Sequence, residues 1–364
     1  MKEGLNMFKR RKTSNVFVDN IGIGSDHPVT IQSMTNTDTR NVEKTLFQIN
    51  ELTNAGCEII RIAIPDMEAA EKTKEIVSRS PIPVIADIHF DYRLALETIK
   101  NGIHGLRINP GNIGNEERIR QVVETAKAYN IPIRIGVNSG SVEKEMLEKY
   151  KGVNSNSLIE SALKHVKILE KMNFDQIKIS IKASEVPLMI DVYRKLAKKV
   201  NYPLHLGVTE AGSVNTGIIK SAVGIGTLLA EGIGDTIRVS LTGNPVNEII
   251  VAKDILKSLK LKEEGIQIVS CPTCGRCQVD LEKIVLEVEE KTKGYKENIK
   301  LAIMGCVVNG PGEAREADLG IAGGINEGLL FKKGEIIRKI KEEDIVKELL
   351  IELEKIRGEK NESI

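Results

Sequence analysis

Eight short runs rich in β-branched residues, separated by segments of helical length, fill the first two-thirds of the chain. The runs are VTIQSM (29–34), EIIRIAI (58–64), IPVIADI (82–88), GLRI (105–108), IPIRIGV (131–137), QIKISI (176–181), PLHLGV (203–208) and TIRVSL (236–241). Most are almost continuously apolar, which is typical of parallel strands buried on both faces. Eight such strands alternating with helices predict a (β/α)₈ TIM barrel. A doubly wound α/β sheet is the alternative that this pattern leaves open.

The segments between the runs have the periodicity of amphipathic helices. In residues 42–56, the apolar side chains of Val42, Leu46, Ile49 and Leu52 recur at helical spacing. Gly56 follows directly, where a glycine commonly ends a helix in the left-handed conformation. We therefore expect a helix that packs on the outside of the barrel.

The alternation changes at the polar stretch SLKLKEEG, residues 258–265, so we place a domain boundary near residue 260. Beyond it the sequence predicts a small α/β domain of about 100 residues. Its expected elements are a strand, a cysteine-rich turn, a helix, a further strand, a Gly/Pro turn, two more strands and a closing helix. The predicted domains are residues 1–260 and 261–364.

The composition excludes some classes of function. The chain has 364 residues, with 52 basic and 51 acidic side chains, and only 3% of its residues are aromatic. Such a chain offers no basic field and few stacking platforms, which argues against nucleic-acid binding. It has no stretch of eighteen apolar residues and no apolar signal segment behind the basic N-terminus. We therefore expect a soluble cytoplasmic protein.

Polar side chains occur at the carboxyl ends of most predicted strands, which is where barrel enzymes place their active sites. Four arginines and a lysine gathered in one barrel mouth would need an anion to neutralise them. Arginine suits bidentate phosphate binding, so several of them together predict a diphosphate ligand. The strand-end residues are Gln32, Arg61, Asp87, His89, Arg107, Asn109, Arg134, Asn138, Lys178, Lys182, His205, Glu210, Arg238 and Ser240.

Four of the five cysteines lie in a window of 36 residues, which is too clustered for a secreted disulfide framework and fits metal ligation. Cys271 and Cys274 form a C-x-x-C pair, and Cys306 follows in the run MGCVVNGPGE, which ends at Glu313. Structural zinc is one interpretation of this set. An iron-sulfur cluster is favoured, because Glu313 on a glycine-rich turn could hold one iron weakly and leave it free to exchange ligands.

Nine motifs together resemble the 4-hydroxy-3-methylbut-2-en-1-yl diphosphate synthases of the bacterial two-domain type, over residues 12 to 335. They are IQSMTNT, ADIHF, LRINPGN, IRIGVNSGS, KAS, HLGVTEAG, EGIGDTIRVSLTG, SCPTCGR and MGCVVNGPGEAREADLGIAGG. The resemblance implies a reductive dehydroxylation in the methylerythritol phosphate route to isoprenoids. The implied substrate is 2-C-methyl-D-erythritol 2,4-cyclodiphosphate, bound by the barrel domain, and a 4Fe-4S cluster in the second domain transfers two electrons singly. The implied electron donor is flavodoxin or ferredoxin.

The resemblance also assigns roles to individual residues. The implied cluster ligands are Cys271, Cys274, Cys306 and Glu313. The positions that match diphosphate contacts are Arg61, Arg107, Arg134, Lys182, Arg238 and Ser240, and those that match contacts to the carbon skeleton are Asp87, Asn109, Asn138 and Glu210. Glu210 is the expected proton donor, and Glu313 is expected to be catalytic as well. His205 and Asn309 complete the predicted substrate-binding set.

Cys277 departs from the family pattern, in which a different residue usually stands at this position. We interpret it as a bystander, with the alternative that it replaces Glu313 when the carboxylate is displaced. The resemblance further implies a head-to-tail homodimer whose active sites are shared between subunits. Two competing classes are a barrel lyase with a zinc-stapled second domain and a zinc-dependent scaffold module.

Overall fold

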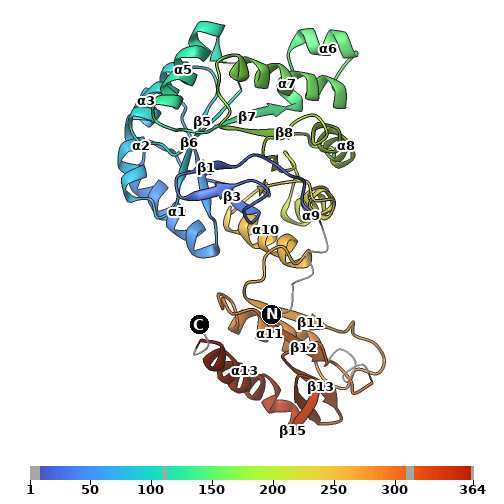
Figure 1. The fold of residues 1–364 in the computed structure, drawn as a ribbon. Coiled ribbons are helices and arrows are strands. Elements are labelled where there is room, and N and C mark those ends of the chain that lie inside the picture. Colours follow the sequence, from blue (N-terminus) through green and yellow to red (C-terminus); the bar gives the residue numbers. More distant parts are fainter. Residues whose placement is uncertain (1–8, 110–112, 309–314, 362–364) are drawn as a thin grey trace. The chain divides into compact units, whose positions relative to one another are not determined.

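The computed structural model describes residues 9–109, 113–308 and 315–361. The chain divides into two compact units, residues 1–262 and 263–364 (Figure 1). Asn309 and Glu313, two predicted site residues, lie outside the described residues. Within the described residues, no helix is long and apolar enough to cross a membrane.

The first unit is built on an eight-stranded sheet whose neighbouring strands run parallel. Its strand order is β8-β7-β6-β5-β4-β3-β10-β9, and a further parallel bridge between Ile179 and Leu204 joins the two ends of the sheet. This closure confirms the barrel and rejects the doubly wound alternative. The strands are β3 (Thr30–Met34), β4 (Ile59–Ala63), β5 (Val84–Ile88), β6 (Gly105–Ile108), β7 (Ile133–Asn138), β8 (Ile177–Lys182), β9 (His205–Leu206) and β10 (Thr236–Ile237).

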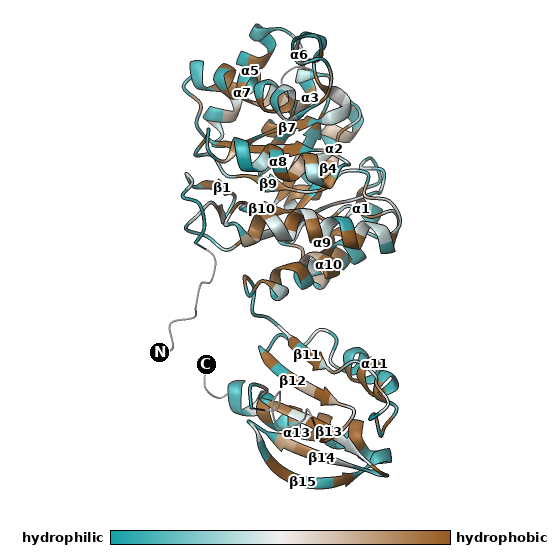
Figure 2. Ribbon diagram, turned by 90° about the vertical axis from the view of Figure 1, so that its right-hand side faces the viewer, coloured by the Kyte–Doolittle hydropathy of each residue, from teal (hydrophilic) through white to brown (hydrophobic). Residues whose placement is uncertain are grey.

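Helices surround the barrel, and each strand's outward apolar residues pack against them (Figures 1 and 2). The first of them, α1, buries Val42, Leu46, Ile49 and Leu52, and Gly56 ends it in the left-handed conformation with φ 106°, as predicted. The helices are α1 (Val42–Ala55), α2 (Met67–Arg79), α3 (Tyr92–Lys100), α5 (Glu116–Ala128), α6 (Lys144–Tyr150), α7 (Ser155–Lys171), α8 (Val186–Leu196), α9 (Val214–Ala230) and α10 (Val246–Ser258). Ser139–Ser141 form a 3₁₀ turn.

An antiparallel hairpin that the sequence analysis did not predict covers the amino-terminal end of the barrel. It consists of β1 (Val16–Val18) and β2 (Ile21–Ile23). Val18 and Ile23 form an apolar cluster with Ile59 and Ile85, at the starts of β4 and β5. This end of the barrel is therefore sealed by hydrophobic packing.

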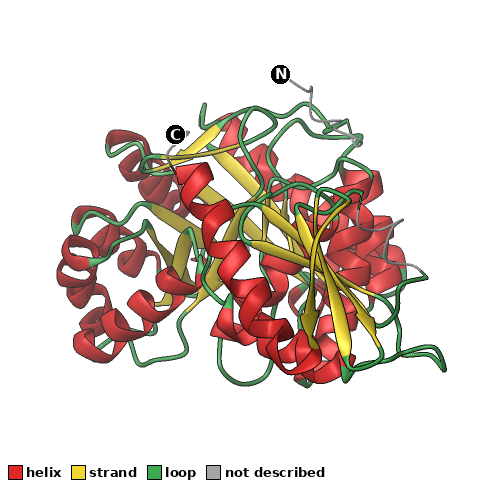
Figure 3. Cartoon of the chain, turned by 90° about the horizontal axis from the view of Figure 1, so that it is seen from below, coloured by secondary structure: helices red, strands yellow, loops and turns green. Residues whose placement is uncertain are grey.

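The second unit is a five-stranded mixed sheet with strand order β11-β12-β13-β14-β15. Helices α11 and α13 contact each other and the sheet, and their apolar residues form one core with β12 and β13. Figure 3 draws the helices of the chain in red and the strands in yellow. The bounds are β11 (Ile266–Ser270), α11 (Leu281–Lys291), β12 (Ile299–Met304), β13 (Leu319–Gly324), β14 (Glu327–Lys332), β15 (Glu335–Lys341) and α13 (Ile345–Asn361), with a 3₁₀ turn at Glu342–Asp344. Each strand and helix predicted for this unit is present, the predicted Gly/Pro turn lies outside the described residues, and β15 was missed.

Candidate active site

Four charged side chains form a continuous row inside the barrel. Asp87 of β5 is in register with Arg107 of β6, Arg107 with Arg134 of β7, and Arg134 with Lys178 of β8. Residues paired in parallel strands point to the same face of the sheet, so the four side chains lie side by side. Each has at most 5% of its surface exposed. One carboxylate therefore shares the barrel interior with three cations.

The Asp87 carboxylate is the counter-ion at one end of this row. Its Oδ1 lies 3.1 Å from Arg107 Nη1, and its Oδ2 lies 3.6 Å from Arg61 Nε of β4. His89, which follows β5, lies 3.5 Å from the same carboxylate. Burial alone would raise the pKa of Asp87, but Arg61, His89 and Arg107 outweigh it and hold the pKa well below its ordinary value. Asp87 is thus ionised throughout the neutral range.

Arg238, directly after β10, adds a further guanidinium group to this set of buried cations. Its Nε lies 3.4 Å from Oε2 of Glu248, a buried residue of α10. The sulfur of Met34, at the end of β3, accepts from Arg61 Nη2 at 2.9 Å and lies 3.8 Å from Arg238 Nη1. Because a thioether carries no charge, Met34 orients the two guanidinium groups without neutralising them.

The positive charge in this interior exceeds the negative charge. Arg61, Arg107, Arg134, Lys182 and Arg238 face only two buried carboxylates among the contacts of the described residues, Asp87 and Glu248. Burial lowers the pKa of Arg61 to about 10. Burial and repulsion from neighbouring arginines lower the pKa of Arg134 and of Lys182 well below their ordinary values. An anionic ligand with several charges would relieve this repulsion.

Unpartnered donors point to the same conclusion. Nε and Nη1 of Arg134 and Nε of Arg107 are buried and have no hydrogen-bond partner among the described residues. A buried donor without a partner is costly, and such atoms in a native protein call for a ligand or water. Phosphoryl oxygens would supply the missing acceptors.

Two glycines make room for the cations, and the sequence analysis did not single them out. A Cβ on Gly136 of β7 would lie 2.4 Å from Arg107 Nε. A Cβ on Gly207, directly after β9, would lie 2.7 Å from the Arg238 backbone oxygen and 3.3 Å from Lys182 Nζ. A glycine inside a strand often marks such a close approach, and this signal was available in the runs IRIGV and LHLGV. Met34 and Glu248 were also missed.

Of the other predicted barrel residues, three lie at or just after the carboxyl ends of their strands: Asn109, Asn138 and Ser240. The strand-end prediction was wrong for Arg134, Lys178 and His205, which occupy the first or second position of β7, β8 and β9. Asn109 is buried directly after β6, and Asn138 ends β7 in register with Lys182. Ser240 is half-buried after β10. His205 is fully buried in β9, where its Nδ1 lies 2.7 Å from Thr236 Oγ1, so it lies deeper than the prediction implied.

Glu210 is exposed in the loop between β9 and α9, and its backbone is left-handed with φ 51°. Non-glycine residues rarely adopt this conformation, and those that do are concentrated in turns and functional loops. Its carboxylate is therefore carried by a constrained loop at the carboxyl end of the barrel.

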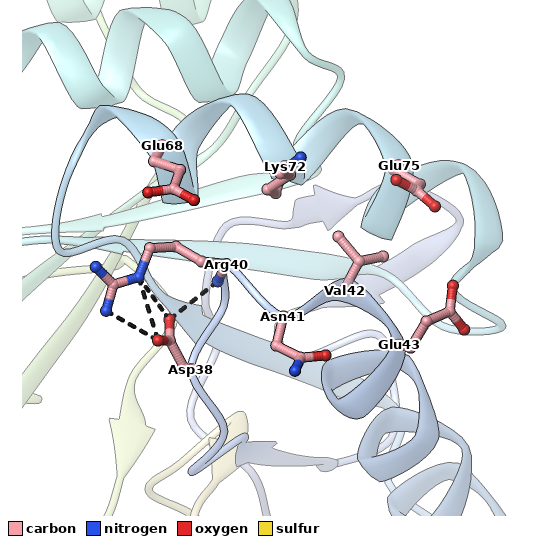
Figure 4. A pocket seen from close by; sticks show the side chains of 8 residues that line it. All are labelled: Asp38, Arg40, Asn41, Val42, Glu43, Glu68, Lys72 and Glu75. Carbon is pink, nitrogen blue, oxygen red and sulfur yellow. Dashed lines mark hydrogen bonds and ion pairs between the residues drawn. The ribbon is translucent and has the colours of Figure 1, made fainter.

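A surface hollow of about 660 Å³ lies between α1 and α2, outside this set. Asp38, Arg40, Asn41, Val42, Glu43, Glu68, Lys72 and Glu75 line it (Figure 4). Arg40 is paired with Asp38 at 2.8 Å, and four carboxylates but only two cations line the hollow, so it does not suit a polyanion. None of the predicted site residues lines this hollow.

In the second unit, the cysteines meet at one edge of the sheet. Strands β11 and β12 are parallel, and Ser270 is in register with Ile303, so Cys271 and Cys306 follow the same ends of neighbouring strands. The backbone N–H of Gly305 donates to Cys271 Sγ at 3.3 Å. Cys306 is buried, and Cys274 is exposed on the turn. Backbone donors of this kind stabilise a thiolate that ligates a metal.

The thiol of Cys277 is engaged elsewhere. It donates to the Val279 backbone oxygen at 3.2 Å and lies against Gly305, where a Cβ would come within 2.4 Å of its sulfur. In the part of the chain that the structure describes, no three His, Cys, Asp or Glu side chains are close enough to hold one metal ion. The donor chemistry of Cys271, Cys274 and Cys306 nevertheless fits a thiolate-bound metal or iron-sulfur cluster.

The fold and this site define the chain as a (β/α)₈ barrel enzyme with a cationic barrel interior and a cysteine-bearing α/β unit. The family model described as the GcpE TIM-barrel domain matches residues 13–253, and that of the GcpE protein C-terminal domain matches residues 267–355. The chain belongs to the GcpE family, which confirms the predicted family and fold.

Curated relatives in the family are similar over nearly their whole length. The chain is 61% identical over 346 residues to a Clostridium acetobutylicum protein and 62% identical over 347 residues to one from Clostridium perfringens. Each match covers 95% of this chain and 99% of the relative. Both relatives are named 4-hydroxy-3-methylbut-2-en-1-yl diphosphate synthase (flavodoxin).

Among solved structures, Yersinia pestis dihydropteroate synthase in complex with a sulfonamide drug has a TM-score of 0.50 and 10% identity, over 68% of this chain and 100% of that one. This likeness concerns the barrel fold alone.

Proposed function

We propose that this chain is an oxidoreductase that converts 2-C-methyl-D-erythritol 2,4-cyclodiphosphate into 4-hydroxy-3-methylbut-2-enyl diphosphate. The reaction consumes two electrons and two protons, cleaves one ring C–O bond, forms the alkene and releases one water. The observation that carries the proposal is the cationic interior of the barrel, with Arg61, Arg107, Arg134, Lys182 and Arg238 facing two carboxylates. The names of the relatives supply the identity of the product.

Residues 1–260 form the substrate-binding domain in this proposal. Arg61, Arg107, Arg134, Lys182, Arg238 and Ser240 hold the diphosphate. Fixing a polyanion at several points from separate strands restricts its rotation, so that the ring carbon atoms are presented in one orientation. The unpartnered atoms of Arg134 and Arg107 support this role, because phosphoryl oxygens would satisfy them.

The polar side chains around the diphosphate-binding residues contact the carbon skeleton of the substrate. Asn109, Asn138, Asp87 and His205 contact its hydroxyl groups, and Asn309 joins them. Glu210 delivers a proton to the oxygen that leaves as water. Its position on a constrained loop after β9 supports this, because a proton donor must be held in reach of the reacting oxygen.

Residues 261–364 form the cluster domain. Cys271, Cys274 and Cys306 would hold a 4Fe-4S cluster, with Glu313 as the fourth ligand. When bound, such a cluster supplies the two electrons one at a time. The N–H of Gly305 stabilises the Cys271 thiolate. Cys277 stays a bystander, because its thiol bonds to Val279 and is packed against Gly305.

The partners follow from the same proposal. Flavodoxin is the electron donor, as in the names of the relatives, with ferredoxin as the alternative. The chain acts in the cytoplasm as a head-to-tail homodimer in which the cluster domain of one subunit serves the barrel of the other. Sedimentation analysis that finds a fully active monomer would contradict the dimer.

One experiment separates this function from a barrel lyase with structural zinc. The protein is purified without oxygen, assayed for iron, sulfide and zinc, and then incubated with the cyclodiphosphate and reduced flavodoxin. We expect a brown protein with about four irons per chain, the content of one 4Fe-4S cluster, and formation of the linear diphosphate. A colourless protein that contains zinc and gives no product would overturn the proposal.

A further inference from the structure

Lys178 is a buried amine for which the proposed reaction has no use. It occupies the row next to Arg134, is 2% exposed, and its Nζ has no hydrogen-bond partner within the described ranges. An ammonium in such a place lacks both solvent and acceptors. The side chain is therefore poised between a charged and a neutral form.

The charged groups around Lys178 come from three neighbouring elements and from its own strand. Arg134 on β7 repels a proton on Lys178, and Lys182 adds positive charge further along β8. His205 of β9 lies near enough for Lys178 to depress its protonation. Among the residues that the structure describes, Asp235, just before β10, is the carboxylate that favours the charged form.

Asp235 is already committed to other partners. Its Oδ1 accepts from Arg10 Nη2 at 2.7 Å, and its Oδ2 accepts from the Leu204 backbone N–H at 2.8 Å. It therefore offers Lys178 only long-range attraction. Burial first, and Arg134 second, lower the pKa of Lys178 to about 7.

We propose that Lys178 is neutral in the empty barrel and takes up a proton when a polyanion binds beside Arg134. The anion offsets the charge of Arg134 and supplies acceptors in the buried site, so both the repulsion and part of the desolvation that disfavour the charged form of Lys178 are removed. Lys178 is then a positioning residue, because it acts on the ligand through Arg134. The inference depends on the proposed function only for the identity of the anion.

Two other groups could receive the proton, and the structure favours Lys178 over both. Burial and the surrounding cations keep the pKa of His205 well below its ordinary value, so a much stronger field is needed to charge it near neutral pH. Lys182 belongs to the diphosphate grip itself and faces four arginines. Of the three groups, Lys178 has the pKa nearest to neutral pH, so binding of the same anion changes its charge most.

The consequence is measurable as proton-linked binding. A group that is mostly neutral at pH 8 in the free protein and protonated in the complex takes up most of one proton per anion. Affinity then falls as the pH rises above 7, by up to about tenfold per pH unit. Without Lys178, this part of the slope disappears.

The test is calorimetric titration of the cluster-containing protein without an electron donor, so that no turnover occurs. The ligands are the cyclodiphosphate and sulfate, neither of which titrates between pH 7 and pH 9. Each titration is run at pH 8 in Hepes and in Tris, whose ionisation heats differ. The difference in heat gives the number of protons taken up. Lys178→Met removes the amine, Lys178→Arg fixes the charge, and Lys171→Met on the exposed face of α7 is the control.

We expect wild type and the Lys171 variant to take up at least half a proton more than either Lys178 variant. Equal uptake in wild type and both Lys178 variants would overturn the inference, as would binding without uptake in wild type. If neither Lys178 variant folds, the binding heats of the wild-type protein in the two buffers are compared instead. No proton uptake would then exclude the inference, and uptake of at least half a proton would support it. Proton uptake with sulfate but no binding of the cyclodiphosphate would uphold Lys178 and reject the proposed substrate. Absence of binding by either anion would reject both.

Discussion

Asp87 Oδ1 lies 3.1 Å from Nη1 of Arg107, the residue directly in register with it on the neighbouring strand. The other oxygen of the same carboxylate faces Arg61 at 3.6 Å. Asp87 thus holds two guanidinium groups at fixed positions inside the barrel, while Arg134, the next residue in the row, has donors that no other described residue accepts. The Asp87 end of the row is thus neutralised, and the Arg134 end offers donors to an anion.

Asp87→Asn should destabilise the barrel more than an ordinary surface change, because it leaves buried arginines without their counter-ion. We expect a loss of about 3–5 kcal/mol in the free energy of unfolding, measured by urea denaturation. Added sulfate should restore part of it by binding the freed cations. Asp175→Asn, at an exposed position, is the control and should stay within about 0.5 kcal/mol of wild type. A loss below about 1 kcal/mol for Asp87→Asn would contradict this role.

Gly136→Ala should weaken substrate binding without unfolding the barrel. The added methyl group would lie 2.4 Å from Arg107 Nε, so the guanidinium must move away from Asp87. We expect the KM for the cyclodiphosphate to rise by about tenfold or more, equivalent to about 1.4 kcal/mol. Gly140→Ala is a matched control, since a Cβ there has open space within 4 Å. Equal KM values for the two variants would show that the crowding has no consequence.

Gly305→Ala should disturb the cysteine edge, because its Cβ would lie 2.4 Å from Cys277 Sγ. We expect a loss of iron and sulfide from protein purified without oxygen, together with a lower melting temperature. Adding Cys277→Ala removes the obstructing sulfur, and the nearest remaining contacts are ordinary, at 3.4 Å. The double variant should regain its iron. If it stays as depleted as the single variant, the steric explanation is wrong.

Cys277→Ala alone should leave the iron content unchanged, because its thiol bonds to Val279 rather than to a ligand position. Cys274→Ala should lose most of the iron. Metal analysis and the visible absorption of both proteins check this directly. A similar loss in the two variants would make Cys277 a ligand.

The pH dependence of stability should report the buried amine of Lys178. Its pKa is about 7 in the folded protein, and that of an unfolded lysine is about 10.4, so the unfolded chain binds more protons between these values. Stability therefore rises with pH in this window, by about 2 kcal/mol between pH 7 and pH 9 from this group. Lys178→Met should lack this increment when unfolding is compared at the two pH values. If the difference in unfolding free energy between wild type and Lys178→Met is the same at pH 7 and pH 9, the pKa of Lys178 does not lie in this range.

The order of elements in the barrel was readable from the chain, since buried parallel strands are long apolar runs and their helices have strong periodicity. The hairpin β1–β2 was missed because its strands have only three residues each. Strand β15 was missed because nearly all of its side chains are exposed or half-buried, so hydrophobicity gives little signal. Both are held by pairing with neighbours that the local sequence does not reveal.

The sequence by itself determined which polar side chains the barrel strands carry and which cysteines follow β11 and β12, because strand periodicity and motif spacing are local properties. Only the tertiary structure decided that Asp87, Arg107, Arg134 and Lys178 form one row, since register between strands depends on packing of the whole barrel. It also brought Glu248 from α10 to Arg238. The burial that lowers the pKa of Lys178 likewise belongs to the closed barrel, because desolvation is a property of the surroundings and not of the residue.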